Sequence, residues 1–197
     1  MKHLLPFILL FTYCISVAQE RHDKREAIED RPLRWADFRG HAQLDSYSAK
    51  IWTDIDWSPK DTFKKAQLPR LTATAYFLTI LSTVSKKFLV DKPDSVKKRV
   101  LNHEQGHYNI TRIAAAELST IFATFPFNPG RYRFQADSLR VVMMKRVYTY
   151  QKLYDKQSNH SRNHAAQAMW DKLITQGLIH KRLPDTTCTL TKETAKK

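Results

Sequence analysis

Cysteine is almost absent from this chain of 197 residues, which contains only Cys14 and Cys188. Cys14 lies in a segment that we expect to be removed, and the one remaining thiol cannot form an intramolecular disulfide. The folded protein must therefore be stabilised by an apolar core or by a bound metal. About 180 residues remain after that removal, which is enough for one domain and too few for two.

The chain also lacks an apolar run long enough to cross a membrane. Its almost uninterrupted run from Leu4 to Val17 falls short of the roughly 18 residues that a span requires. The run follows Lys2 and closes with the small-x-small pattern Ser16-Val17-Ala18, so residues 1–18 are predicted to be a cleavable signal peptide. The bulky residues before Cys14 argue against a lipoprotein anchor. We expect an exported protein, secreted or periplasmic, without a transmembrane segment.

Acidic residues are outnumbered: 19 Asp and Glu stand against 33 Lys and Arg, which gives a formal net charge of +14. Such a surface favours anionic partners, and for an exported protein these are acidic polymers, anionic lipid head groups or acidic substrates. No nucleic-acid-binding motif is present, so nucleic acid is not an expected partner. The alternative is a solvated basic face without a particular partner.

Glycine is scarce and there is no internal repeat, so boundaries are read mostly from prolines and polar clusters. Residues 19–32 are highly charged and are predicted to form a mobile arm. The segments 48–57 and 71–84 are rich in Thr, Ile, Tyr, Phe and Trp, which is typical of strands in a small antiparallel sheet. The basic residues 181–197 are predicted to be a disordered tail.

Three helices are predicted to follow the sheet. The first opens at the capping residues and early proline of 91–95 and ends near Pro126. Strands first and helices afterwards, without βαβ alternation, predict a single α+β domain over residues 33–180. The second and third helices are expected over residues 135–154 and 162–176, with a polar loop at 155–161 and Gly177 ending the last helix.

The first of these helices has one apolar face that also contains two histidines. His103 and His107 stand one turn apart, so their imidazoles can converge on one zinc ion at about 2.0–2.1 Å each. Glu104 points about 100° further round the helix, which suits a general base that handles water rather than a metal ligand. The alternative is a pair of core histidines satisfied by hydrogen bonds. The face consists of Val96, Val100, His103, His107, Ile110, Ala114, Leu118 and Ile121.

Gly106 lies between the two histidines. A glycine in the middle of a helix costs about 1 kcal/mol relative to alanine, so its presence usually marks the close approach of another group. We therefore expect a neighbour to pack against this position; a merely tolerated glycine is the alternative.

A catalytic zinc normally takes a third protein ligand. The metzincin continuation needs Gly and His where this chain has Ile110 and Ile113. Glu117 lies about 15 Å along the same helix from His107, too far to share a metal, and Glu193 falls in the basic tail. Of the residues that remain we predict His160, because the loop that holds it is fixed by helices at both ends, with His164 second. The others are Asp137, Asp155, Asp171 and His180.

Three groups of residues form a spaced combination along the predicted domain. They are Trp35-x-Asp37-Phe38-x-Gly40, His103-Glu104-Gln105-x-His107, and Tyr154-Asp155-x-x-Ser158-x-His160 followed by Gln167 and Trp170. The combination resembles the bacterial family called domain of unknown function 922, which is described as secreted zinc-dependent protease-like proteins. The resemblance covers about residues 33–178; the central motif is shared with many zincins, and Ser158 stands where threonine is expected.

The resemblance implies a zincin-like fold with His103, His107 and His160 as zinc ligands and Glu104 as the base. It supplies no substrate, so the peptidase label rests on analogy with other zincins. Two further roles are hypotheses: Asp155 orients a ligand, and Tyr154 or His164 donates a hydrogen bond to the oxyanion.

The expected function is therefore a secreted zinc metallopeptidase that hydrolyses a peptide or protein substrate with zinc-activated water. One alternative is a basic cell-envelope-binding protein whose metal site is structural or vestigial. Glu104 discriminates between the two, since a structural site needs no general base. Another alternative is an amidase that acts on cell-wall amides by the same metal chemistry.

Overall fold

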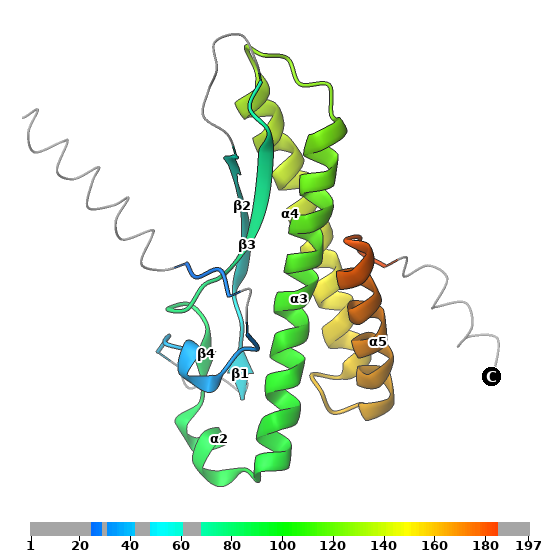
Figure 1. Cartoon of the computed structure of the whole chain (residues 1–197). Helices are drawn as coiled ribbons and strands as arrows, with labels where there is room; N and C mark the ends of the chain where they lie inside the picture. Colours follow the sequence, from blue (N-terminus) through cyan, green and yellow to red (C-terminus); the bar gives the residue numbers. More distant parts are fainter. Residues whose placement is uncertain (1–24, 29–30, 42–47, 61–67, 185–197) are drawn as a thin grey trace, which may run out of the picture.

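The structure, a computed structural model, describes residues 25–28, 31–41, 48–60 and 68–184 (Figure 1). The predicted signal peptide lies outside these residues. Residues 19–24 and 29–30 of the predicted arm and residues 185–197 of the predicted tail also lie outside them. Among the described residues, no helix is both long and apolar enough to cross a membrane.

The strands form two antiparallel pairs. β2 (Thr53–Pro59) pairs along its whole length with β3 (Leu71–Phe77), and the short β1 (Ala49–Lys50) pairs with β4 (Thr83–Val84). Both pairs come from the segments whose β-branched and aromatic residues predicted strands. The inward residues Ile55, Ala75 and Phe77 are buried, so one face of the β2–β3 pair belongs to the core.

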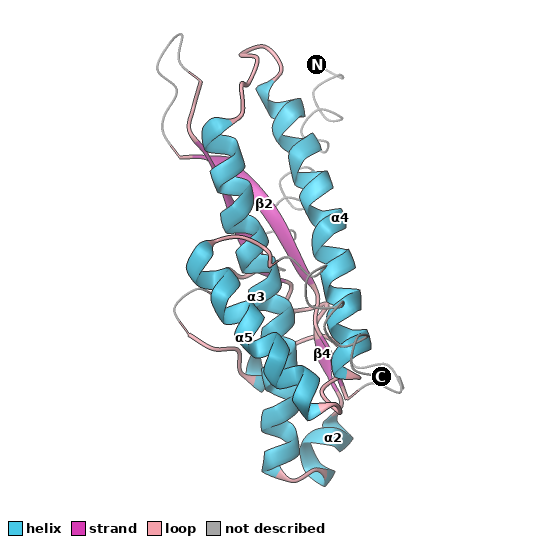
Figure 2. Ribbon diagram, turned by 90° about the vertical axis from the view of Figure 1, so that its right-hand side faces the viewer, coloured by secondary structure: helices cyan, strands magenta, loops and turns pink. Residues whose placement is uncertain are grey.

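The helices follow the strands, which confirms the predicted α+β class. The long helix α3 (Asp94–Thr124) lies between the β2–β3 pair on one side and α4 (Tyr132–Ser158) and α5 (His164–His180) on the other (Figures 1 and 2). Most of its predicted apolar face is buried, with Ile110, Ala114 and Leu118 almost fully covered, while Val96, Val100 and Ile121 are half-buried. The structure adds α2 (Lys86–Asp91) and a short 3-10 turn, η1 (Trp35–Asp37).

Two predicted helix boundaries were wrong. α4 runs four residues past Tyr154 to Ser158, so Asp155 is helical rather than part of a loop. α5 continues past Gly177 and ends at His180, where Lys181 takes the left-handed conformation. Gly177 is a packing residue instead, because a Cβ there would lie 2.8 Å from Ile113 Cδ1.

The described part of the predicted mobile arm is packed against the domain. Glu26 forms a bridge with Phe77, and the buried Ile28 donates its backbone N–H to the Tyr108 hydroxyl at 2.9 Å. The first residues of the predicted tail are likewise attached, since the Leu183 backbone N–H donates to Glu117 at 2.9 Å. These contacts place both ends of the described chain against α3.

Candidate metal centre

Two histidines and one carboxylate meet where α3 and α4 pack together. His103 Nε2 and His107 Nε2, one turn apart on α3, each lie 3.0 Å from Asp155 Oδ1 on α4. The ligand atoms of the three residues all lie within 4.8 Å of one another, and among the described residues this is the group that could hold a metal ion. Both histidines are buried, while Asp155 is half-buried.

The spacing of this group fits a small divalent ion. Ligands at about 2.0–2.1 Å in a tetrahedral site are separated from each other by about 3.3 Å. The two Nε2–Oδ1 distances of 3.0 Å are only slightly shorter, so a small outward movement of the carboxylate would open a site of that size. Imidazole and carboxylate donors suit zinc and also accept other divalent transition metals.

Asp155, rather than the predicted His160, lies next to both α3 histidines. The third ligand was predicted to be His160, with Asp155 orienting it, but Asp155 lies against both α3 histidines and His160 lies beyond it. His160 Nδ1 is 3.3 Å from Asp155 Oδ1, and about half of the His160 side chain is exposed, at 48%. The reason is the longer α4, which carries Asp155 on the face that packs on α3.

A run of left-handed backbone holds His160 in this place. Asn159, His160 and Ser161 have φ values of 47°, 49° and 69°. Each such residue costs about 1–2 kcal/mol for a side chain other than glycine. Strain of this kind clusters at functional sites, and here the turn brings His160 back over Asp155 while it buries Ser161.

Gln167 fixes the orientation of His103. Its amide nitrogen donates to Tyr154 Oη at 2.6 Å and to Asp171 Oδ1 at 2.8 Å, so its oxygen is the acceptor that faces His103 Nδ1 at 3.1 Å. The Nδ1 proton is thereby assigned, which directs Nε2 at the metal position. His107 has no such support, because its Nδ1 is buried without a hydrogen-bond partner among the described residues.

His103 and Asp155 shift each other's pKa values toward the charged forms. Burial alone would lower the pKa of His103, but hydrogen bonds to Asp155 and Gln167 and the charge of Glu104 raise it above its ordinary value. Burial likewise opposes ionisation of Asp155, but its hydrogen bonds to both histidines hold the pKa of the carboxyl below its usual range. The carboxylate of Asp155 and the imidazole of His103 therefore favour each other's charged forms.

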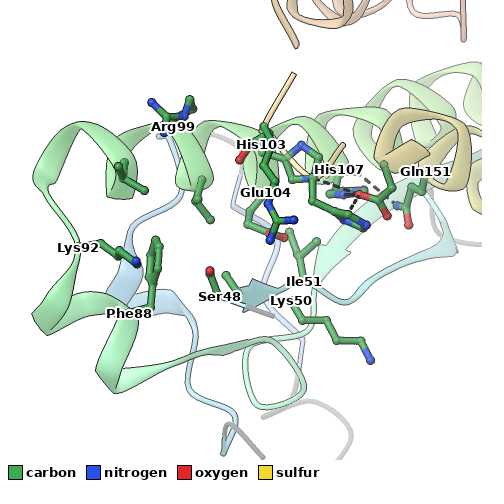
Figure 3. A pocket seen from close by; sticks show the side chains of 17 residues that line it. Ser48, Lys50, Ile51, Phe88, Lys92, Arg99, His103, Glu104, His107 and Gln151 are labelled. Atoms are coloured by element: carbon green, nitrogen blue, oxygen red, sulfur yellow. Dashed lines mark hydrogen bonds and ion pairs between the residues drawn. The ribbon is translucent and has the colours of Figure 1, made fainter. Parts of the chain in front are cut away.

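Glu104 lies beside the group without belonging to it. Its side chain is buried, and it turns toward the backbone of Ile51 at the end of β1 (Figure 3). Burial raises the pKa of the Glu104 carboxyl, and the nearby histidines only partly offset that increase. A carboxyl with a raised pKa next to a metal position suits a group that both accepts and returns a proton.

Tyr154 supports the site from behind, which differs from the predicted oxyanion role. The ring stacks on His103, with centroids 4.5 Å apart, and the hydroxyl is fully buried between Gln167 and the His103 carbonyl. A Cβ on Gly106 would clash with this hydroxyl. The expected close neighbour of Gly106 is therefore Tyr154.

An open cleft of about 740 Å³ leads to the centre, with β1 on one side and α3 on the other (Figure 3). His103, Glu104 and His107 form part of its wall, and Asp155, His160 and Gln151 also line it. Gln151 is tied to Thr111 Oγ1 at 3.2 Å and approaches the His107 carbonyl at 3.5 Å. The cleft thus connects the three candidate ligands and Glu104 with solvent.

The remaining candidates lie elsewhere. His164 is exposed at the first position of α5 and does not line the cleft, so its predicted oxyanion role has no support from its position. His180 is exposed at the last position of α5. Asp137 accepts a hydrogen bond from Trp57, and Asp171 accepts from Gln167 and Asn102.

The residues that carried the family resemblance fall into two places: some adjoin this centre, and those of the N-terminal segment lie away from it. Asp37 is buried and accepts two hydrogen bonds at 2.8 Å from Arg31, while Trp35 packs edge-on against Phe88 in the cleft wall. Ser158 lies 3.5 Å from His103 Nδ1, and Trp170 packs on Tyr154. Comparison of the chain with protein families, curated proteins and solved structures found no match. The resemblance therefore stays a prediction.

Proposed function

We propose that this protein is a zinc-dependent metallopeptidase that acts outside the cytoplasm and hydrolyses a peptide or amide bond. The observation that supports it most is the convergence of His103 Nε2 and His107 Nε2 on Asp155, with the buried Glu104 beside them in an open cleft. A structural metal site has no use for an acid–base group at the cleft wall. A zincin-like fold and membership of the family that the sequence resembles are parts of the same proposal.

His103, His107 and Asp155 are the residues that would hold the ion. Zinc bound to these three residues would supply Lewis acidity, which makes water nucleophilic near neutral pH and polarises a carbonyl. Gln167 keeps the imidazole of His103 in the required tautomer, and His160, whose Nδ1 lies 3.3 Å from Asp155 Oδ1, helps to hold that carboxylate in place.

Glu104 moves the proton. Its carboxylate takes a proton from the attacking water, and its raised pKa then allows the same carboxyl to return that proton to the leaving nitrogen.

Metal content and peptide hydrolysis together test the proposal. After dialysis against a trace of chelator, we expect about one zinc per chain, and none in a His103→Ala variant. Glu104→Gln should retain zinc but lose about 10²–10⁴-fold of the hydrolysis rate, because only the proton-transfer group is removed. Glu117→Gln is the matched control, since Glu117 also lies on α3 and is paired with Arg146 far from the cleft. Zinc binding with no hydrolysis of any peptide would favour a non-catalytic binding protein.

A further inference from the structure

One side of α4 carries large apolar side chains that the other described elements leave exposed. The helix packs on α3, α5 and β2 with its remaining sides, and Figure 2 shows it along one edge of the helices. The exposed fractions on its outer side are 64% for Phe134, 46% for Val141, 57% for Val142 and 60% for Tyr148. Apolar surface that gathers in one exposed place marks an interaction site, whereas single exposed apolar residues do not.

These residues form a row along the helix. Phe134, Val141 and Tyr148 recur every seven residues, which is close to two turns, so they follow one another over about 21 Å of the axis. Lys145 and Lys152 stand four residues after Val141 and Tyr148 and therefore project from the same side. We call these five residues the α4 row. Apolar and cationic side chains alternate along it.

Cations lie against both aromatic rings of the α4 row. The guanidinium carbon of Arg131 is 5.5 Å from the centroid of the Phe134 ring, and the ammonium nitrogen of Lys152 is 4.4 Å from that of Tyr148. Each pair joins an apolar ring to a positive charge at its border. Lys145 is also exposed, between the two pairs.

The acidic residues of α4 are engaged in other directions. Asp155 lies against the α3 histidines, and Asp137 accepts a hydrogen bond from Trp57 Nε1 at 2.8 Å. Asp54 of β2 lines a hollow beside the α4 row, but it is paired with Arg140 at 3.4 Å. The α4 row is therefore positively charged, like the whole chain with its formal net charge of +14. Its partner should be anionic.

The spacing of the α4 row favours a lipid surface over a helical protein partner. A helix that packs lengthwise on another needs apolar residues at alternating steps of three and four. Here the positions between the apolar ones are Ser138, Lys145 and Lys152. A lipid surface requires no such match, because apolar side chains enter the boundary of the acyl chains while lysines extend back to the phosphates.

We propose that the α4 row binds a membrane surface that contains anionic phospholipid. Phe134, Val141 and Tyr148 enter the acyl boundary, and Lys145 and Lys152 lie at the level of the phosphates. This binding goes beyond the function proposed above and does not depend on the metal centre.

Vesicle sedimentation tests the proposal. The protein, in the form in which cells export it, is mixed with vesicles of phosphatidylcholine or of phosphatidylcholine and phosphatidylglycerol in equal parts. We expect binding to the mixed vesicles that weakens as the salt concentration rises, and at least about tenfold weaker binding to the neutral ones, because lysines near an anionic surface are each worth about fivefold. Equal binding to the two kinds of vesicle, or binding to neither, would overturn the proposal.

Two double variants locate the surface. Val141→Ser with Tyr148→Ser should weaken binding to the mixed vesicles by at least about tenfold, since each change removes an apolar side chain from the acyl boundary. Lys145→Gln with Lys152→Gln should weaken it by about 25-fold, and the remaining binding should depend less on salt. All four side chains are exposed, so circular dichroism should show an unchanged fold.

Matched controls come from the other helices. Val90 and Ile179 are exposed apolar residues at 81% and 70%, and Lys98 and Lys172 are exposed cations. Val90→Ser with Ile179→Ser, and Lys98→Gln with Lys172→Gln, should each leave vesicle binding within about twofold of wild type.

The variants also separate the α4 row from other causes of binding. Binding that survives both α4 double variants, or that falls equally in the controls, would show that another surface or the net charge alone is responsible. Analytical ultracentrifugation gives the remaining outcome. A dimer that dissociates with Val141→Ser and Tyr148→Ser, without vesicle binding, would make the α4 row a contact between two copies of this chain and overturn the proposal.

Discussion

The two halves of α3 bury their side chains by different means. From Ile110 to Phe122 the covered residues are mostly apolar and pack against β3, α4 and α5. Before Ile110, the buried residues include His103, Glu104 and His107. An apolar side chain is stabilised by any close-packed neighbour, whereas a buried polar one needs a specific partner.

The first half therefore depends on polar groups from other helices. Asp155 and Tyr154 come from α4 and Gln167 comes from α5, and each forms a hydrogen bond with His103. A network of this kind holds its geometry only while every member is present. The difference teaches that one helix can provide the stability of the fold with one half and a positioned chemical site with the other. The two halves should then respond differently to substitution.

The largest expected effect on stability lies in the apolar half. Leu118→Ala removes a side chain with 0% exposure and should lower the free energy of unfolding by about 2–5 kcal/mol, because a cavity is left behind. The zinc affinity of the folded variant should stay within about twofold of wild type, since the two halves are separate. Urea denaturation and a competitive zinc titration give the two numbers. A large loss of zinc affinity would mean that the halves are coupled.

Asp155→Asn should have a large effect on zinc affinity and a smaller one on the free energy of unfolding. Loss of a direct ligand should weaken zinc binding by more than the 10–100-fold typical of an outer partner, that is by more than about 2.7 kcal/mol. His160→Ala is the matched variant, because His160 contacts Asp155 from the exposed side and should cost about 10–100-fold at most. If His160→Ala loses more zinc affinity than Asp155→Asn, His160 is the third ligand, as the sequence had predicted.

Gln167→Leu tests the support behind His103. The substitution removes the acceptor at 3.1 Å from His103 Nδ1, so zinc affinity should fall by about 10–100-fold. It also leaves the buried Tyr154 hydroxyl without its donor, which should cost about 1–3 kcal/mol of stability. Gln105→Leu is the control, because it also replaces a hydrogen-bonding glutamine. The Gln105 side chain accepts from the Leu33 backbone N–H, away from the cleft. Unchanged zinc affinity in Gln167→Leu would show that packing alone orients His103.

Much of this fold could be predicted from local patterns. The strands of the β2–β3 pair, the bounds of α3 and its apolar stripe follow from residue type and periodicity, because these are properties of neighbouring residues. The pair of candidate metal ligands on α3 could also be predicted, since His103 and His107 belong to one turn. The position of Asp155 beside them could not, because it depends on which face α4 turns toward α3.

A signal for that face was nevertheless present. Gln151, Tyr154, Asp155 and Ser158 stand at i, i+3, i+4 and i+7, which is one face of a helix. All four contact α3 residues in the structure: Gln151 and Tyr154 reach backbone carbonyls, and Asp155 and Ser158 reach histidine nitrogens. This polar periodicity predicts a helix that continues to Ser158, and with it the inward position of Asp155.

The smallest expected effect is on the pH dependence of stability in the metal-free protein. Because the pKa of Asp155 is lowered, its contribution is present above the unfolded value of about 3.9 and is lost as the pH falls through the folded value. Because the pKa of His103 is raised, its contribution is full below about 6.5 and is lost as the pH rises through the folded value. The contribution of this ion pair to the free energy of unfolding should therefore be greatest between these limits. Urea denaturation in chelator across the pH range should give a flatter curve for Asp155→Asn, while Leu118→Ala should lower the whole curve and keep its shape. The same shape in wild type and Asp155→Asn would mean that the polar half of α3 does not depend on this ion pair.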